Sequence, residues 1–326
     1  MGYLENKRLF LAGATGCAGA NILNYVLEHY SRTTIRATYF HTQPFIHHPR
    51  VEYVFCDLKS LEECRKAARG CDCAVMVAAN TAGANIIAAS PSSHVTDNLI
   101  MNVQMLEAFH AEAIQRIVYV GSASLYPEFN GSIQEDQLDW NQDPHPAYFG
   151  YGWVVRCTEK LCKYWHDVHG KEILITRTAN IYGPYAKFDP ERSNFIPAII
   201  HKAVAKMEPF EIWGNPEVTR DVLYAPDFGR AVAMMIDNDR IQFDIFNLCS
   251  GTQTRVADVV KWALQYAGHS PKNIEYLPNR PTTIQFRALD NGKIKSRLGW
   301  EPRVSPEEGI QATTQWWMEN REKWTK

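Results

Sequence analysis

The chain has 326 residues, of which 45% are hydrophobic and 21% are charged, and its formal net charge is −2. This length allows one large domain or two medium ones, and the near-neutral charge without basic runs argues against binding to nucleic acid or to a membrane surface. No apolar run is long enough to span a bilayer, and charged residues interrupt the N-terminus early, so a cytoplasmic location is expected.

The first half of the chain alternates short apolar runs with amphipathic stretches of helical periodicity. Strands are predicted at residues 8–13, 34–40, 51–58, 73–79 and 116–124. Helices are predicted at residues 18–30, 60–70, 95–113 and 151–170. Buried strands that alternate with helices are typical of a parallel, doubly wound sheet.

After about residue 176 the pattern becomes more mixed and contains many prolines and glycines. This change suggests a smaller second domain, with some segments returning to the first. We therefore predict an α/β protein in which residues 1–176, with about 221–250, form a Rossmann-type doubly wound parallel sheet. Residues 177–220 and 251–326 are predicted to form a smaller C-terminal α/β domain that binds the substrate.

The eight cysteines are scattered along the chain, and several lie inside apolar runs. Cys71 and Cys73 form a CxC pair with no CxxC beside it. This pattern favours reduced thiols that fill the core over disulfides or metal ligands. No metal site is expected.

The segment GATGCAG lies between the first predicted strand and the first helix, with Gly13, Gly16 and Gly19 in the spacing GxxGxxG. Glycines here allow a tight turn and let the backbone approach a pyrophosphate at the helix N-terminus, where free N–H groups favour anions. Thr15 and Cys17 lie in the same turn. In this context the pattern predicts a bound dinucleotide, NAD or NADP.

The end of the second predicted strand bears on which of these cofactors is used. NAD-binding folds usually carry an acidic residue about 20 residues after the glycines, where it binds the ribose 2′-hydroxyl. Here the strand ends in Tyr39, Phe40 and His41, with no carboxylate. The missing acid removes the main repulsion of a 2′-phosphate, and His41 or Arg36 could help to hold one, which gives a slight lean to NADP.

Asp57 and Leu58 follow the third predicted strand directly, and they have two interpretations. Both residues are well placed to meet the adenine edge of the cofactor. Asp57 is equally well placed to be the N-cap of the next helix.

Together these segments resemble the extended short-chain dehydrogenase/reductases, the NAD(P)-dependent epimerase/dehydratase family that acts on nucleotide sugars. The resemblance covers nearly the whole chain and rests on GATGCAG, MVAANTAG, VGSASLYPE, Tyr151 with Glu159, RTANIYGP, SNFIPA, WGNPEVTRDVLYAPDF and LDNGKIKSRLGWEP. SLYPEF, EKLCKYW and FEIWG look most like the branch that holds GDP-mannose 3,5-epimerase and GDP-fucose synthase. The resemblance implies that Ala78 and Ala79 also contact the cofactor.

In this family a serine at the end of the fifth strand and a tyrosine on the next helix share the substrate hydroxyl, and the resemblance assigns these roles to Ser122 and Tyr151. A lysine four residues after the tyrosine normally lowers its pKa and binds the nicotinamide ribose. This chain has Val155 at that position. Either Arg156 reaches back to Tyr151, or Val155 packs on an apolar helix face and the positive ring of the cofactor assists the tyrosine. Should Tyr151 not carry the proton, Tyr148 is the first alternative.

Two further positions narrow the reaction that the resemblance implies. SASLYP lacks the acid that dehydratases carry after the serine. Ser124 and Asn194 stand where 3,5-epimerases use a cysteine and a histidine or lysine, and a serine is far too weak an acid to replace a thiol. Ser124 stays a candidate catalytic residue by its position. Redox at a sugar carbon, most often C4, is therefore favoured; the alternatives are a 3,5-epimerase and a regulatory protein that binds without turnover.

The resemblance also implies a nucleotide-sugar substrate, with a GDP-sugar favoured over a UDP-sugar. Asn180, Asn194, Arg220 and Arg287 match positions that hold the sugar and the pyrophosphate in this family. Two arginines suit a diphosphate because each guanidinium presents parallel donors. Trp213 resembles a tryptophan of the GDP-sugar branch that lies near the base.

The predicted helices at 95–113 and 151–170 correspond to those that form a four-helix dimer interface in this family. Both carry apolar residues beyond one stripe. A homodimer is therefore expected.

Overall fold

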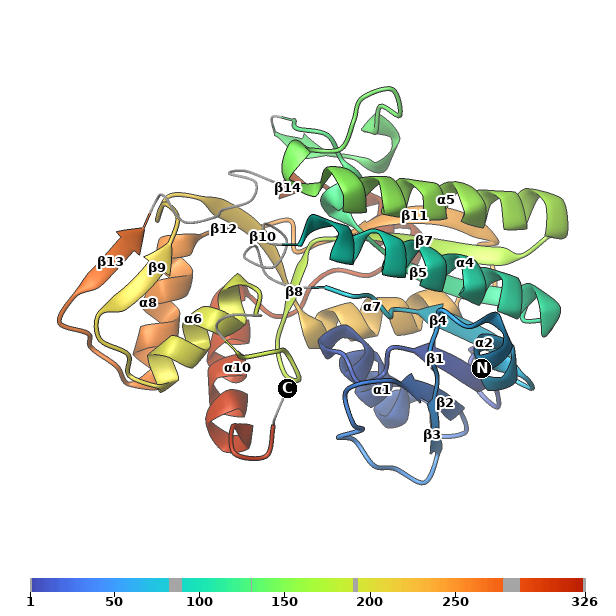
Figure 1. Cartoon of the computed structure of the whole chain (residues 1–326), viewed down its shortest axis with the longest axis horizontal. Coiled ribbons are helices and arrows are strands. Elements are labelled where there is room, and N and C mark those ends of the chain that lie inside the picture. The colour runs from blue at the N-terminus through green and yellow to red at the C-terminus, as the bar shows by residue number, and fades with distance from the viewer. Residues whose placement is uncertain (1, 82–89, 130, 190–192, 278–287, 325–326) are drawn as a thin grey trace.

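A seven-stranded sheet forms the centre of the computed structural model, which describes residues 2–81, 90–129, 131–189, 193–277 and 288–324 (Figure 1). Its strands are β1 (Arg8–Ala12), β2 (Thr34–Tyr39), β3 (Val51–Phe55), β4 (Cys73–Met76), β5 (Arg116–Ser122), β7 (Glu172–Thr178) and β11 (Phe243–Leu248). Their order is β3-β2-β1-β4-β5-β7-β11, and every neighbouring pair is parallel. The chain winds outward from β1 to β3 in one direction and from β4 to β11 in the other, which confirms the predicted doubly wound sheet.

Helices cover both faces of this sheet (Figure 1). One face carries α1 (Cys17–His29) and α7 (Ala225–Asp237), and the other carries α2 (Leu61–Ala68), α4 (Thr96–Ala111) and α5 (Phe149–His169). Along β1, Leu9 and Leu11 lie in the core under α1 and α7, whereas Phe10 and Ala12 lie in the opposite core. This alternation follows the two-residue period of a strand.

A buried charge network ties α5 to the sheet. Arg177 of β7 and Glu159 of α5 form two hydrogen bonds of 3.0 Å, and both side chains are buried. The Arg177 guanidinium also donates to the hydroxyl of Tyr126 (2.9 Å) and to the carbonyl of Glu135 (2.8 Å). The Tyr126 hydroxyl in turn donates to Oδ1 of Asn247 on β11 (2.7 Å). One guanidinium therefore joins a helix, two strands and the segment that follows β5.

The remaining elements lie mostly beside the carboxyl ends of the large sheet (Figure 1). The strands are β8 (Asn180–Tyr182), β10 (Thr219–Tyr224) and β12 (Gln253–Arg255) in one sheet, with the pairs β9 (Phe210–Trp213) with β13 (Ile274–Leu277) and β6 (Ser132–Ile133) with β14 (Ala288–Leu289). The helices α6 (Phe195–Val204), α8 (Val256–Ala267) and α10 (Pro306–Asn320) pack around a separate apolar core. A further helix, α9 (Gly292–Leu298), packs on β11, and its Ile294 joins the core under α1 and α7.

Within the described ranges, no helix combines the length and the apolar character that crossing a membrane requires. The division of the chain at the predicted domain boundaries stays a prediction.

Candidate active site

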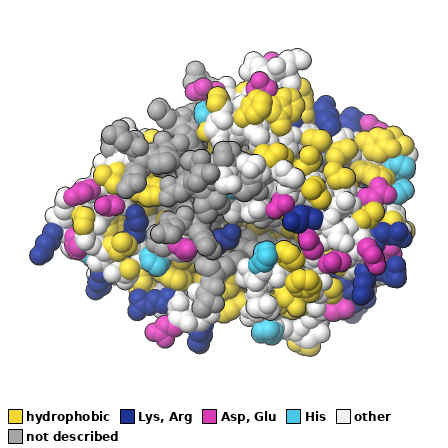
Figure 2. Space-filling model, in the orientation of Figure 1, with side chains coloured by type: hydrophobic (Ala, Val, Ile, Leu, Met, Phe, Trp, Pro, Cys, Tyr) yellow, Lys and Arg dark blue, Asp and Glu magenta, His cyan; other side chains and the backbone are white. Residues whose placement is uncertain are grey.

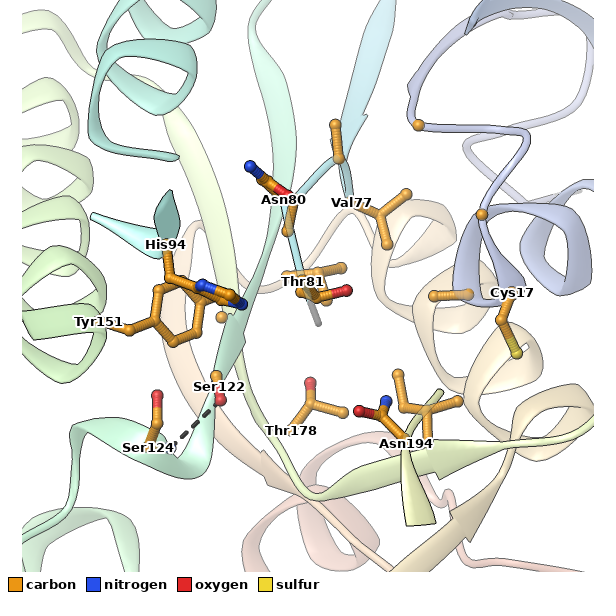
Figure 3. A pocket seen from close by; sticks show the side chains of 18 of the residues that line it. Cys17, Val77, Asn80, Thr81, His94, Ser122, Ser124, Tyr151, Thr178 and Asn194 are labelled. Atoms are coloured by element: carbon orange, nitrogen blue, oxygen red, sulfur yellow. Dashed lines mark hydrogen bonds between the residues drawn. The ribbon is translucent and has the colours of Figure 1, made fainter. Parts of the chain in front are cut away.

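A cavity of about 1210 Å³ lies where the carboxyl ends of the large sheet meet the smaller part of the chain. Both parts supply lining residues, from the turn after β1 to the strands β8 and β10. Sites of this kind are expected where the strand order of a doubly wound sheet reverses. Figure 3 shows that Ser122, Ser124, Tyr151 and His94 gather on one side of this cavity, with Cys17 on the opposite side.

The glycine-rich turn lines the cavity with its backbone. Gly13 has φ +87°, and a Cβ there would lie 2.7 Å from Cα of Ala78. A Cβ on Gly19 would lie 2.1 Å from the carbonyl oxygen of Gly13. Gly16 is the N-cap of α1, and the first turn of that helix carries no acidic residue. The helix N-terminus therefore opens into the cavity without a competing negative charge, which fits the pyrophosphate of NAD(P). Thr15 and Cys17 also line the cavity.

The predicted adenosine end of the cavity is lined by Tyr39, Phe40 and His41 after β2 and by Asp57 and Leu58 after β3. No carboxylate comes from the described residues at the end of β2. Ala78 and Ala79, after β4, line the cavity as well.

Two alternatives that the sequence left open at this end are wrong. The N-cap of α2 is Ser60, whose Oγ accepts from the Glu63 amide (3.3 Å), so Asp57 does not cap that helix. Asp57 instead accepts from the Lys59 amide in a local turn (3.0 Å). Arg36 is not at the cavity, because its guanidinium bonds Glu52 and the carbonyls of Ala67 and Arg69 at the end of α2.

Ser122 and Tyr151 reach the same side of the cavity from different elements. Ser122 ends β5, and its Oγ accepts from the Ser124 amide (3.2 Å; Figure 3). Tyr151 lies in the first turn of α5 and also lines the cavity. Burial raises the pKa of Tyr151 to about 12. A tyrosine with this pKa is almost wholly protonated near neutral pH, so it needs another group to assist it before it can act as a base.

Val155 packs on an apolar helix face, as one of the two alternatives for the missing lysine expected, and assistance to Tyr151 by the cofactor ring stays a prediction. Its side chain is fully buried in an apolar cluster with Ala123, Leu125, Cys249 and Leu289.

The alternative in which Arg156 reaches Tyr151 is wrong. The guanidinium of Arg156 donates to the carbonyls of Leu125 (2.8 Å) and Gln142. The physical reason is helical geometry, since a residue five positions after Tyr151 projects in a different direction from the residue four positions after it.

His94 is a feature of the site that the sequence analysis missed. It ends the short 3₁₀ helix η1 (Pro91–His94), lines the cavity and is 6% exposed. Its ring centroid lies 6.5 Å from that of Tyr151, with the two planes at 81° (Figure 3). Burial, and then the charge of Lys187, lower the pKa of His94. The residue stands 57 positions before Tyr151 in no recognised motif, so the sequence offered no signal.

The residues predicted to hold the substrate divide into three groups. Asn180, Asn194 and Arg220 line the cavity. Trp213 lies on β9, is not among the described residues that line the cavity, and packs near the ammonium of Lys202 (5.7 Å from its ring centroid). Arg287 lies outside the described residues.

The profile of the NAD dependent epimerase/dehydratase family matches residues 9–249. A GDP-mannose 3,5-epimerase of Arabidopsis thaliana is 28% identical to this chain, over 98% of the chain and 84% of that protein.

Solved structures show the same fold. An epimerase from Methanothermobacter thermautotrophicus matches with a TM-score of 0.86 at 21% identity, over 98% of this chain and 94% of that one. A UDP-glucose 4-epimerase from Thermotoga maritima, solved with UDP-glucose, matches with a TM-score of 0.84 at 20% identity, over 96% and 99%. The family profile spans the glycine-rich turn, Ser122 and Tyr151. The chain therefore belongs to the NAD dependent epimerase/dehydratase family and is an NAD(P)-dependent enzyme.

Proposed function

We propose that this protein carries out redox chemistry at C4 of a nucleotide sugar, as a 4-epimerase, a 4-keto reductase or a 4-dehydrogenase, with a GDP-sugar preferred over a UDP-sugar. The observation that carries the proposal is that Ser122 and Tyr151 share one cavity with the glycine-rich turn and with Arg220. The preference for GDP is supported by the 28% identical relative, whose name is GDP-mannose 3,5-epimerase.

In the proposed reaction the residues of this chain hold the sugar and move one proton. Ser122 and Tyr151 hydrogen-bond the C4 oxygen, and Tyr151 takes the hydroxyl proton during oxidation or returns it during reduction. The bound NAD(P) supplies the hydride acceptor and donor. Arg220, which lines the cavity from β10, is placed to neutralise the diphosphate of the substrate, and Asn180 and Asn194 to orient it.

A 3,5-epimerase is the second candidate, because the 28% identical relative carries that name. Epimerisation at C3 and C5 needs an acid and a base on the two faces of the sugar ring. Ser124 and Asn194 stand at the positions predicted for them, and neither side chain ionises near neutral pH. This chemistry is therefore ranked below redox at C4.

The test is a panel of GDP- and UDP-sugars incubated with the purified protein and NAD or NADP. A change in nicotinamide absorbance indicates net oxidation or reduction, and a C4 epimer without deuterium uptake from D₂O indicates 4-epimerisation. Deuterium at C3 or C5 would support the 3,5-epimerase instead. If no sugar reacts although the cofactor binds tightly, both redox at C4 and 3,5-epimerisation are contradicted, and the protein is a binding protein.

Tyr151→Phe tests the proton carrier, because it removes the hydroxyl and barely changes the volume. We expect the rate to fall roughly 10²–10⁴-fold while the protein stays folded. An unchanged rate on the true substrate would exclude Tyr151 and direct the test to Tyr148, which also lines the cavity.

We further propose that NADP is preferred to NAD. The support is the end of β2, where His41 lines the cavity and the described residues of that strand end supply no carboxylate to repel a 2′-phosphate. Calorimetric titration should give the lower Kd for NADP, and His41→Ala should weaken NADP more than NAD. Equal or tighter binding of NAD would contradict this preference.

A homodimer is proposed from the outer faces of α4 and α5, where Figure 2 shows hydrophobic side chains gathered. The large exposed hydrophobic residues on these helices are Ile100, Val103, Phe149, Trp153, Tyr164 and Val168. An exposed apolar surface of this kind is typical of a protein interface. Light scattering at micromolar concentration should give twice the mass of one chain.

A cytoplasmic location is proposed because all eight cysteines are free, which is the state that a reducing compartment maintains.

A further inference from the structure

One basic side chain that lines the cavity lies close to Tyr151 and has no role in the proposed reaction. Among the described lining residues, the basic side chains are Lys59, Arg220, His41 and His94. Lys59 follows β3 at the predicted adenosine end and pairs with Asp97 (3.4 Å). Only His94, of these described residues, has a ring contact with Tyr151.

His94 is held in position by hydrogen bonds of its own backbone and by close packing. The Asn98 amide group donates to the carbonyls of His94 (2.8 Å) and Asn80 (3.0 Å), and it accepts from the Asn80 N–H (2.7 Å). At the next position, Val95 packs on the start of α5 so closely that a Cβ on Gly150 would lie 2.7 Å from it. These contacts fix the distance between His94 and the first turn of α5, which carries Tyr151.

We propose that His94 accepts the proton that the Tyr151 hydroxyl gives up, and so acts through Tyr151 in place of the missing lysine. The inference rests on the proposed function, in which Tyr151 exchanges a proton with the sugar hydroxyl. As the sugar O–H bond breaks, the proton passes to Tyr151, the original Tyr151 proton leaves, and an N–H bond forms on His94. The two rings lie edge to face with their centroids 6.5 Å apart, and the proposed transfer runs from the Tyr151 hydroxyl to a His94 nitrogen through one bridging water. Reduction runs the same transfers in reverse.

The electrostatic surroundings keep His94 ready to accept a proton. Lys187 faces it from the segment after β8, with its ammonium donating to the Thr81 carbonyl (3.2 Å), and Tyr151 faces it from α5. On α4, Asp97 is paired with Lys59. Burial and Lys187 lower the pKa of His94 below its ordinary value, so the ring is neutral at pH 7 and offers one nitrogen lone pair. A lysine would act differently, by stabilising the tyrosinate with its charge.

The first experiment compares His94→Gln with His29→Gln, a matched change at an exposed histidine of α1. On the sugar found in the panel, we expect kcat to fall roughly 10²-fold in His94→Gln and to stay unchanged in His29→Gln. In the oxidation direction the wild-type rate should fall as the pH drops below the pKa of His94, and this acidic limb should be absent in His94→Gln. The same acidic limb in both proteins would overturn the proposal.

The second experiment asks whether a lysine makes His94 dispensable. His94→Gln/Val155→Lys should recover at least part of the lost kcat, since an ammonium one turn from Tyr151 stabilises the tyrosinate. His94→Gln/Val155→Met, with a side chain of similar length and no charge, should not. Equal rates in the two double variants, when both are folded, would contradict the replacement of one group by the other.

A third measurement needs no turnover and separates the two proposals. In the holoprotein labelled with ¹⁵N-histidine, the His94 signal, assigned with His94→Gln, is titrated with and without Tyr151→Phe. We expect Tyr151→Phe to raise the pKa of His94, because the bridging water that donates to the neutral ring loses its partner on Tyr151, while burial and Lys187 still hold the pKa below its ordinary value. An unchanged pKa of His94 in Tyr151→Phe would overturn the proposed proton transfer from Tyr151 to His94. Silence with every sugar, alongside the expected shift, would instead overturn the proposed function.

Discussion

The two ends of the cavity differ in how closely they follow the family pattern. At the glycine-rich turn, Gly13 and Gly19 leave no space for a side chain because the neighbouring atoms belong to the backbone. At the other end, the cluster around Val155 is apolar, and the lysine that usually assists the tyrosine is absent. Binding of the cofactor depends on backbone shape, which tolerates little change. Proton transfer depends on charge, which another residue nearby can supply.

The largest effect is expected from the charge pair that orients the catalytic helix. Glu159→Ala leaves the buried Arg177 guanidinium without its carboxylate, which should cost about 3–5 kcal/mol in the free energy of unfolding. Denaturant unfolding measures this loss. The control is Lys163→Ala on the same helix, whose pair with Asp167 is half exposed, and it should cost less than about 0.5 kcal/mol. Similar losses in both variants would contradict the role given to the buried pair.

Gly19→Ala should be the next most severe change, and it tests the cofactor end of the comparison. The new Cβ would lie 2.1 Å from the Gly13 carbonyl oxygen, so the turn must shift, at a cost of about 3 kcal/mol in stability. Calorimetry should also show that NAD(P) binding is lost.

Gly16→Ala is the matched control in the same turn. Its Cβ would meet the Gly13 carbonyl oxygen at 3.4 Å, so stability should change little while cofactor affinity falls. Normal affinity in both variants would show that the pyrophosphate does not bind at this turn.

At the catalytic end, Val155→Lys should lower the pKa of Tyr151 from about 12 by about 1–3 units. The pKa of Tyr151 falls because a nearby ammonium favours the charged tyrosinate, whereas burial disfavours it. The absorbance of tyrosinate against pH, with the Tyr151→Phe curve subtracted, measures the shift. Val155→Met controls for side-chain length, and an equal shift in that variant would exclude a charge effect. Overpacking of the site should cost about 1–3 kcal/mol in both.

The smallest effect is expected from Ser124→Ala. The Ser124 hydroxyl is buried and has no hydrogen-bond partner among the described residues, so its removal should change stability by less than about 0.5 kcal/mol. The hydroxyl lies at the cavity, where a substrate group would satisfy it, so KM should rise while kcat changes less. A loss of stability above about 1 kcal/mol would indicate a partner within the protein.

The sequence predicted those features that local chemistry determines. The spacing of Gly13, Gly16 and Gly19 and the alternation of apolar strands with helices led to the correct sheet and turn. Asp57 and Leu58 also line the cavity, as expected for residues that follow a parallel strand.

Features that depend on tertiary packing were harder to predict. Arg36 has a long side chain that can reach several partners, and Glu52 of β3 together with two carbonyls at the end of α2 holds it away from the cavity. Trp213 was assigned by resemblance, but the position of β9 follows from packing that its own sequence does not encode. His94 comes close to Tyr151 because η1, which it ends, packs against α5.

The Arg177 network has a consequence for the way in which the protein loses activity on heating. The guanidinium that fixes α5 also contacts the segment after β5, so the residues around Ser122 and Tyr151 share their supports with the interior of the sheet. Regions held by the core open only in the global transition, whereas loosely held regions open earlier. The temperature at which catalysis is lost should therefore coincide with the midpoint of global melting.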